Sequence, residues 1–308
     1  MGMKVLTDSA ETVWKSLNGL LCVYKPADVS CNNVCKTIAY KITSELNHMN
    51  CRQPIDYVSI EGDPSKHLTV IRRPNLADHP LVVGERYHPD DVRCTWSSFL
   101  GFNTSGVLLL GLQNGTKTAF YIRMSKLMRA YRIKGKLGRA TDNFYKDGKV
   151  VEKTTYKFIK RHHLDGLLAS MQSAHQKKMF ELCGVELQSQ TAYDLAIQGP
   201  IRPADSKIPV IYGIKCVHFD SPDFIIEVHC INEYETYLKT LIHEIGIKLR
   251  STANCTGIQC IRHSYFDLDK ALLRKHWTLQ SIVTNLEQCS NVINEHQNLI
   301  RQDSVTLQ

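Results

Sequence analysis

The chain of 308 residues lacks any run of about 18 apolar residues, the length that a helix needs to cross a bilayer. We therefore expect no membrane span. The chain also lacks internal repeats and low-complexity tracts, and hydrophobic residues make up 43% and charged residues 22% of it. These values exclude long disorder, a collagen-like repeat and a coiled coil as the main architecture. A chain of this length can bury a sizeable core, in one large domain or two modest ones.

Motifs for cofactors and metals are also missing. There is no Walker loop and no GxGxxG motif, and the closest cysteine spacings, Cys31-x3-Cys35 and Cys255-x4-Cys260, lack the second pair that a zinc site requires. We expect no cofactor and no metal. The 11 cysteines are odd in number and no clear signal peptide precedes them, which favours reduced thiols in an intracellular compartment. The N-terminus is neither rich in arginine nor poor in acids, so it does not itself indicate a mitochondrial presequence.

Positive charge is concentrated in one segment. The chain has 38 Lys and Arg against 30 Asp and Glu, a formal net charge of +8. Residues 121–161 alone hold 13 Lys and Arg against 3 Asp and Glu, so the rest of the chain is slightly acidic. Such a basic segment is typical of nucleic-acid binding, and the alternative is a solvated face on an otherwise balanced enzyme.

The hydrophobic pattern predicts an α+β fold with a largely antiparallel sheet, because strands and helices are mixed without regular βαβ alternation. Residues 130–137 alternate between an apolar face and a basic face, the latter formed by Arg132, Lys134 and Lys136. Further strands are predicted at 19–24, 106–111, 154–159 and 224–230, and helices after Ser30, after Asn114 and over 234–245. We divide the chain into an N-terminal extension (1–18), a main domain (19–278) with an insertion or loop region (47–93), and a polar C-terminal tail (279–308).

Four short blocks, in order along the chain, resemble motifs of the TruB-type pseudouridine synthases. They are residues 19–26 (GLLCVYKP), 100–111 (LGFNTSGVLLLG), 130–142 (AYRIKGKLGRATD) with Asp147-Gly148, and 235–246 (ETYLKTLIHEIG). Residues 79–82, 147–156, 174–177 and 198–203 are similar to the second, mitochondrial TruB branch of animals, as is the stop near residue 308 without an evident RNA-binding PUA domain. The resemblance implies that the main domain is a pseudouridine synthase catalytic domain, a bent mixed and mostly antiparallel sheet flanked by helices.

The resemblance also implies a reaction and a site. In that family, uracil is detached from C1′ of an RNA ribose, rotated, and rejoined through C5, while the flipped base is held in a dry pocket. A single Asp begins the reaction, an Arg on a late helix pairs with it, and a Tyr stacks on the base. Their positions are held here by Gly101, Lys239 and Tyr131, in that order. Glycine has no side chain to attack the sugar, take a proton or pair with a cation, and lysine lacks the two-pronged geometry of arginine.

The missing Asp leaves two functions open. The first is an RNA-uridine isomerase with an unrecognised base, for which Asp142 and Asp91 are the first candidates. The second is a catalytically silent RNA-binding or assembly factor that retains the fold, that is, a pseudoenzyme. Gly101 favours the second, because removal of a catalytic nucleophile raises the reaction barrier by many kcal/mol.

RNA is the expected partner under either function, as tRNA or as mitochondrial mRNA or rRNA. The candidate RNA contacts are Lys25, Arg132, Lys134, Lys136, His175 and Lys177. Each has a structural alternative: Lys25 as the end of a strand, the three strand residues as a solvated face, and the last two as ordinary loop residues. Tyr131 as a core tyrosine and Lys239 as an exposed helix lysine are the corresponding alternatives for the site. The resemblance implies a mitochondrial location, otherwise cytoplasmic or nuclear, with proteins of mitochondrial RNA granules as further partners.

Overall fold

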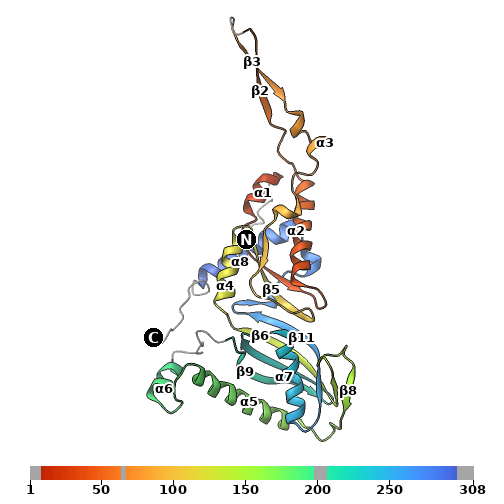
Figure 1. Ribbon diagram of the computed structural model, residues 1–308, viewed down its shortest axis with the longest axis vertical. Helices are drawn as coiled ribbons and strands as arrows, with labels where there is room; N and C mark the ends of the chain where they lie inside the picture. The colour runs from red at the N-terminus through yellow and green to blue at the C-terminus, as the bar shows by residue number, and fades with distance from the viewer. Residues whose placement is uncertain (1–7, 64–66, 198–206, 297–308) are drawn as a thin grey trace.

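The computed structural model describes residues 8–63, 67–197 and 207–296 (Figure 1). Its centre is an eight-stranded sheet of order β1-β5-β11-β6-β10-β9, with β4 paired to β5 and β12 paired to β11. The strands are β1 (Gly19–Lys25), β4 (Cys94–Trp96), β5 (Thr104–Leu112), β6 (Arg129–Leu137), β9 (Val210–Asp220), β10 (Asp223–Ile231), β11 (Ala253–His263) and β12 (Phe266–Asp267). Among these strands only β5 and β11 pair in parallel. The predicted mixed, mostly antiparallel α+β fold is confirmed.

Strand β6 lies inside the sheet, between β11 and β10. Its apolar face is buried and its basic face is exposed or half-buried, as the alternation of residues 130–137 predicts. Helix α7 (Glu235–Lys248) packs against β11 and β6 through a buried stripe that includes Leu238, Leu241 and Ile245. Burial of each such side chain contributes about 2 kcal/mol, so this stripe fixes where the first turn of α7 lies.

The remaining large helices cover the sheet at other places (Figure 1). Helix α2 (Cys31–Asn47) begins at the predicted cap, where Ser30 Oγ accepts a hydrogen bond of 3.1 Å from Asn33 N. Helix α4 (Gly115–Met124) packs on β5 and β1, and α5 (Arg161–Leu182) packs on β9. Helix α6 (Gln190–Ile197) precedes residues 198–203, one of the segments of family resemblance, which lie outside the described residues.

A small hairpin follows the central strand β6. Strand β7 (Arg139–Thr141) pairs with β8 (Val150–Lys153), and the chain then turns. The predicted strand over residues 154–159 is therefore wrong. Thr154 N donates to Gly138 O at 3.1 Å, while its hydroxyl accepts from Thr252 N at 2.9 Å, and Ile159 N closes a turn on Tyr156 O at 2.9 Å. These bonds tie the segment to Gly138, to Thr252 and to its own turn, and none of them is part of a strand ladder.

Both ends of the described chain pack on the main domain. Helix α1 (Ala10–Ser16) contacts α2, and helix α8 (Leu279–Glu295) contacts β1 and α2. The sequence predicts a polar helix or frayed tail over 279–308, and the structure has a helix up to Glu295 whose buried apolar stripe was not predicted. The buried Asn285 supports this docking, because its Oδ1 accepts from Cys22 N at 2.8 Å and its Nδ2 donates to Lys270 O at 2.8 Å. Residues 297–308 lie outside the described part.

The insertion region 47–93 projects from the main domain at the top of Figure 1. It contains the hairpin of β2 (Asp56–Glu61) and β3 (Thr69–Pro74), the helix α3 (Pro80–Val83), and short 3₁₀ helices over Leu76–Asp78 and Pro89–Asp91. The residues of β3 are all exposed and those of β2 nearly so, which explains why the sequence shows no alternation there. Two further 3₁₀ turns, Leu268–Lys270 and Arg274–His276, precede α8. In the described ranges no helix is long and apolar enough to cross a membrane.

Candidate functional site

Gly101 lies in the loop before β5, directly against the first turn of α7. A Cβ added to Gly101 would lie 2.5 Å from the Cβ of Glu235 and would overlap the carboxylate of Glu235. The backbone of Gly101 is not among the positive-φ glycines, so its conformation does not require glycine. Glycine is needed here for space, because the Glu235 side chain fills the volume that any side chain at residue 101 would enter.

The Glu235 carboxylate is held at both oxygens. Its Oε2 accepts hydrogen bonds from Thr104 N at 3.1 Å and from Thr104 Oγ1 at 2.9 Å. Its Oε1 lies 2.8 Å from Lys239 Nζ, one helical turn further along α7, in an ion pair whose side chains are 15% and 13% exposed. The carboxylate also stands in the first turn of the helix, where the helix dipole favours negative charge. The result is a largely buried, oriented carboxylate beside Gly101.

Lys239 connects this carboxylate to two other segments. Its Nζ donates to Asn103 Oδ1 at 2.8 Å, and Asn103 Nδ2 donates to Asp28 Oδ1 at 3.1 Å in the turn after β1. Lys239 Nζ also lies 4.7 Å from the ring centroid of Tyr145, a cation–π contact. Burial raises the pKa of Tyr145 to about 12. The structure thus brings Gly101 and Lys239 together, with Tyr145 as the aromatic neighbour of the Lys239 ammonium.

Lys25 lies beneath the same loop and is 0% exposed. Its Nζ donates to three backbone carbonyls, those of Pro26 at 3.1 Å, Phe102 at 3.2 Å and Thr104 at 2.6 Å. Burial lowers the pKa of its amino group. The sequence predicts an RNA contact for Lys25, but the structure turns its amino group into the interior. We therefore assign Lys25 to the support of the loop over residues 101–104.

Tyr131 belongs to a second buried cluster. It is 2% exposed, and its hydroxyl donates to Glu233 Oε1 at 2.8 Å. Arg129 forms an ion pair with Glu233, lies 5.7 Å from the ring centroid of Tyr131, and donates from Nη1 to Phe99 O at 3.0 Å. Tyr131 therefore contacts Glu233 and Arg129, whereas Tyr145 contacts the Lys239 side. Burial and the neighbouring Glu233 raise the pKa of the Tyr131 hydroxyl, although Arg129 acts in the opposite direction.

His263 lies at the edge of this second cluster, opposite Arg129 on the paired strands β11 and β6. It is 2% exposed, and burial together with Arg129 lowers its pKa from 6.5 to about 3. The unfolded chain therefore binds a proton that the folded chain excludes, between about pH 6.5 and 3. Stability from this group is complete above pH 6.5 and decreases as the pH falls.

We expect the free energy of unfolding to fall by about 2 kcal/mol between pH 7 and 5 through His263 alone. The variant His263→Phe removes the titrating group at similar volume and should show a correspondingly flatter profile, measured by urea unfolding at each pH. The exposed His276 provides the control, and His276→Phe should keep the slope of the native chain. Equal slopes for native chain and His263→Phe would contradict the assignment.

Beside the Tyr131 cluster, a pocket of about 330 Å³ opens to the surface. Basic and aromatic side chains dominate its lining, which consists of Trp96, Ser98, Phe99, Arg123, Lys126, Leu127, Arg129, Asn232 and Glu233. Phe99 and Phe102 are 64% and 55% exposed on either side of Gly101. Cationic groups beside exposed aromatic rings suit a backbone phosphate with a stacked base.

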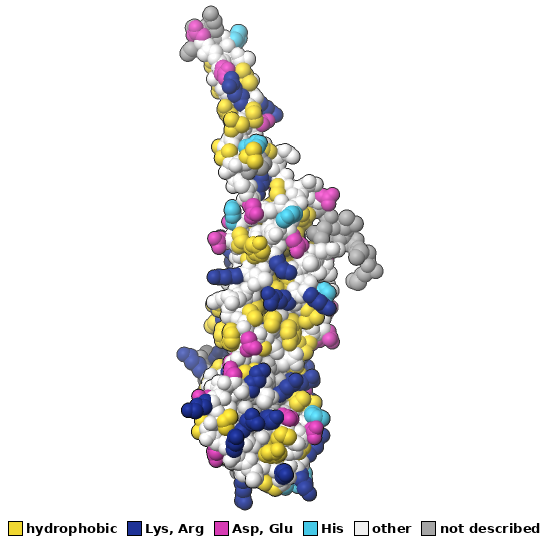
Figure 2. Space-filling view, turned by 90° about the vertical axis from the view of Figure 1, so that its right-hand side faces the viewer, with side chains coloured by type: hydrophobic (Ala, Val, Ile, Leu, Met, Phe, Trp, Pro, Cys, Tyr) yellow, Lys and Arg dark blue, Asp and Glu magenta, His cyan; other side chains and the backbone are white. Residues whose placement is uncertain are grey.

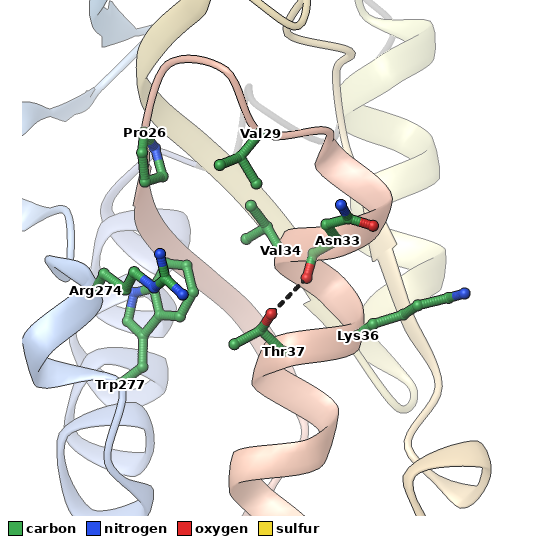
Figure 3. A pocket seen from close by; sticks show the side chains of 8 residues that line it. All are labelled: Pro26, Val29, Asn33, Val34, Lys36, Thr37, Arg274 and Trp277. Atoms are coloured by element: carbon green, nitrogen blue, oxygen red, sulfur yellow. Dashed lines mark hydrogen bonds between the residues drawn. The ribbon is translucent and has the colours of Figure 1, made fainter.

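A second pocket, of about 310 Å³, lies between the turn after β1, helix α2 and the segment before α8 (Figure 3). In Figure 3, Arg274 and Trp277 face Val34 and Thr37 of α2, and Lys36 points away from the cavity. Its lining residues include no carboxylate. We therefore place the candidate site at the loop over residues 101–104.

The basic side chains of the predicted strand lie on the sheet face of Ser105, opposite the face on which Thr104 contacts Glu235. Ser105 of β5 is in register with Gln259 of β11, and Gln259 is in register with Arg132 of β6. Arg132 is therefore two strands, about 10 Å, from the end of the loop. Lys134 is exposed, and Lys136 lies 3.9 Å from Asp223. Figure 2 shows Lys and Arg side chains gathered over the lower half of the molecule, where Figure 1 places this part of the sheet.

His175 and Lys177 lie apart from the loop, on α5. They are helical and not loop residues. Burial lowers the pKa of His175, and Lys177 lies 3.8 Å from Glu181 on the exposed side of the helix. The residues that sequence reasoning missed are Glu233, Glu235 and Tyr145. Glu235 is the first residue of the fourth block of family resemblance, and this position is the one signal that could have identified it as a site residue. Its contact with residue 101 produces no pattern in the neighbouring sequence.

The mixed sheet, together with the meeting of the 101–104 loop and α7, defines a protein with the pseudouridine synthase fold. A family model described as TruB family pseudouridylate synthase (N terminal domain) matches residues 94–238. The chain is 39% identical over 287 residues to the mitochondrial pseudouridylate synthase TRUB2 of Xenopus tropicalis, covering 91% of this chain and 88% of that protein. It is 36% identical over 273 residues to TRUB2 of Homo sapiens, covering 86% and 82%. The chain belongs to the TruB family of pseudouridylate synthases.

Solved structures with a similar course of the chain are more distant. One is a structure of an H/ACA RNP bound to a substrate RNA containing 2′-deoxyuridine, with a TM-score of 0.47, 11% identity, and coverage of 89% of this chain and 62% of that chain. Another is the archaeal box H/ACA sRNP Nop10-Cbf5 complex, with a TM-score of 0.42, 15% identity, and coverage of 93% and 59%. This chain spans less than two thirds of either matched chain.

Proposed function

We propose that this chain binds RNA across the basic face of its sheet and isomerises a uridine at the 101–104 loop to pseudouridine. The observation that carries the proposal is the register that aligns Arg132 with the end of this loop. A phosphate backbone that follows Arg132, Lys134 and Lys136 would bring one nucleotide to the loop and the exposed rings beside it. Family membership supplies the reaction. The reacting base must be flipped out of the RNA, and the exposed rings of Phe99 and Phe102, on either side of Gly101, suit a flipped base.

The proposed substrates are tRNA or mitochondrial mRNA or rRNA, and the proposed location is the mitochondrion. The relatives named above are mitochondrial by their names, and this supports the location for the present chain. Proteins of mitochondrial RNA granules are proposed as partners from the family resemblance of the sequence alone. A second candidate function is a silent RNA-binding or assembly factor, which the absence of a side chain at Gly101 favours. Both functions require RNA binding by the same face.

RNA binding by the basic face is tested by its salt dependence. We expect the combined variant Arg132→Gln, Lys134→Gln, Lys136→Gln to bind transcripts of mitochondrial RNA more weakly. The slope of log K against log salt should fall by about one unit for each phosphate that the variant no longer neutralises, because fewer counterions are released. Filter binding between low and physiological salt measures both quantities.

The control removes three charges elsewhere. Lys36→Gln, Arg72→Gln and Lys275→Gln change exposed residues on α2, β3 and the segment before α8. This variant has the same net charge as the test variant but keeps the sheet face intact. Its slope should stay within about half a unit of that of the native chain. An equal fall in slope in the two variants would contradict a specific RNA path along β6.

A further inference from the structure

The Glu235 side chain occupies the volume that a side chain on residue 101 would need. Residue 101 contributes no atoms beyond the backbone, and the Glu235 carboxylate lies where a side chain on residue 101 would begin. We propose that Glu235 supplies the reacting carboxylate of uridine isomerisation in this chain, from the helix side of the site instead of the loop side. This proposal rests on the proposed function, because it names the group that performs that reaction.

The bonds around Glu235 are those that a reacting carboxylate needs for fixed orientation. Thr104 donates to Oε2 from both N and Oγ1, and Lys239 contacts Oε1. A lysine ammonium is a point charge that pairs with one oxygen, whereas an arginine fork would pair with both. Thr104 holds the second oxygen here, so a lysine at residue 239 is sufficient. Lys239 is itself oriented by Asn103.

The Glu235 side chain is not completely enclosed, since 15% of its surface is exposed. Phe99 and Phe102 are exposed in the chain on either side of Gly101, and Tyr145 lies 4.7 Å from the Lys239 ammonium that pairs with Glu235. A flipped nucleotide could stack there with its ribose next to the carboxylate.

Other carboxylates near the loop are committed to local structure. Asp28 accepts from Asn103, and Glu233 pairs with Arg129 and Tyr131 in the interior. The two carboxylates that the sequence suggested as substitutes bind backbone in other turns, whereas Glu235 contacts the loop over residues 101–104 itself. Asp142 Oδ1 accepts from Asn143 N at 2.8 Å and Lys149 N at 3.0 Å, and Asp91 Oδ2 accepts from His88 N at 3.1 Å.

The reaction balances without a co-reactant. The N1–C1′ bond breaks with its electron pair on N1, uracil rotates, and a C5–C1′ bond forms. The proton on C5 leaves to solvent and a proton from solvent is taken up at N1, so the composition of the nucleotide does not change. The Glu235 carboxylate faces the sugar and stabilises the positive charge that develops at C1′ as the first bond lengthens. Lys239 and Thr104 act as positioning residues.

The test is single-turnover tritium release from transcripts of all mitochondrial tRNAs, rRNAs and mRNAs made with C5-tritiated uridine. Formation of the C5–C1′ bond releases the tritium, and the complete set of transcripts avoids any choice of substrate. We expect release by the native chain. Glu235→Gln should be slower by about 100-fold or more, because it keeps the size but not the charge of the side chain. Its Kd for the same transcripts should stay within about threefold of the native value.

Two further variants complete the test. Glu244→Gln makes the same chemical change at an exposed position of the same helix and should release tritium at the native rate. Glu235→Asp keeps the charge but moves it back by one methylene, and it should retain more activity than Glu235→Gln. This comparison separates the loss of charge from a failure of α7 to pack. Native-like thermal unfolding of Glu235→Gln confirms that the helix is in place.

Failures of the two proposals have different signatures. Tritium release by Glu235→Gln at the native rate would overturn the role of Glu235 and leave the isomerase function standing. Tight RNA binding by the native chain without any release would overturn both the role of Glu235 and the isomerase function, and would support the silent RNA-binding function. If the native chain neither binds nor modifies the transcripts, the proposed function itself fails.

Discussion

Gly101→Asp will destabilise this chain by about 3 kcal/mol instead of restoring an active site. The added Cβ would lie 2.5 Å from the Cβ of Glu235, and the new carboxylate would share one small volume with the carboxylate already there. Either α7 or the loop must shift, and two like charges must approach each other. Urea unfolding of the purified variant measures the loss.

Gly101→Asp should be tolerated once the Glu235 side chain no longer fills the adjacent space. With Glu235→Gly present, which also removes the Cβ of residue 235, Gly101→Asp should cost little, so that a double-mutant cycle gives a coupling free energy of about 2 kcal/mol or more. An aspartate at residue 101 therefore requires Glu235→Gly as a companion change. Additive effects of the two substitutions would show that residues 101 and 235 do not compete for space.

A matched glycine serves as the control for this cycle. Gly166 lies on the exposed side of α5, where an added Cβ meets nothing within 4 Å. Gly166→Asp introduces the same side chain and should change the free energy of unfolding by less than about 0.5 kcal/mol. A large effect at Gly166 would mean that aspartate destabilises this chain for reasons other than overlap with Glu235.

Lys25→Met should cost about 3 kcal/mol or more, although the two side chains are similar in length. Lys25 is completely buried and donates to three carbonyls, and a thioether leaves all three acceptors without that donor. The loop over residues 101–104 should lose order in consequence, which hydrogen exchange of its amides would detect. Urea unfolding gives the global effect.

The control for Lys25→Met is Lys36→Met on the exposed side of α2. It removes the same charge without uncovering any acceptor, and it should leave stability within about 0.5 kcal/mol of native. If Lys25→Met proves equally mild, the lysine reaches its carbonyls at no net gain, and its position reflects RNA contact in another conformation.

Local pattern predicts much of this fold, and it fails at identifiable places. The alternation of residues 130–137 fixes both faces of β6, because a strand inside a sheet with one buried face imposes period two. The docking of helix α8 escapes prediction because its exposed side is polar and only a narrow stripe, with Leu279, Ile282 and Leu286, is buried. The exposed hairpin in 47–93 has no core to face and hence no pattern.

The candidate site shows a different limit of sequence reasoning. Their positions in the family blocks predict that Gly101 and Lys239 lie close together, and in the structure both contact Glu235. The blocks do not reveal that Glu235 bonds to Thr104, because that contact joins residues 131 positions apart and depends on how α7 is placed by its buried stripe. Likewise, Tyr131 has the strand position expected of the stacking residue, yet its hydroxyl donates a hydrogen bond to the buried Glu233. The aromatic ring in contact with Lys239 is that of Tyr145.

The shared volume of Gly101 and Glu235 also restricts the order in which these two positions can change over evolutionary time. A glutamate that arrives at residue 235 while residue 101 still has a side chain meets an overfilled site. A glycine that arrives first at residue 101 leaves an empty but foldable one. The passable route therefore runs through glycine first, and once both residues are in place residue 101 cannot regain a side chain before residue 235 changes.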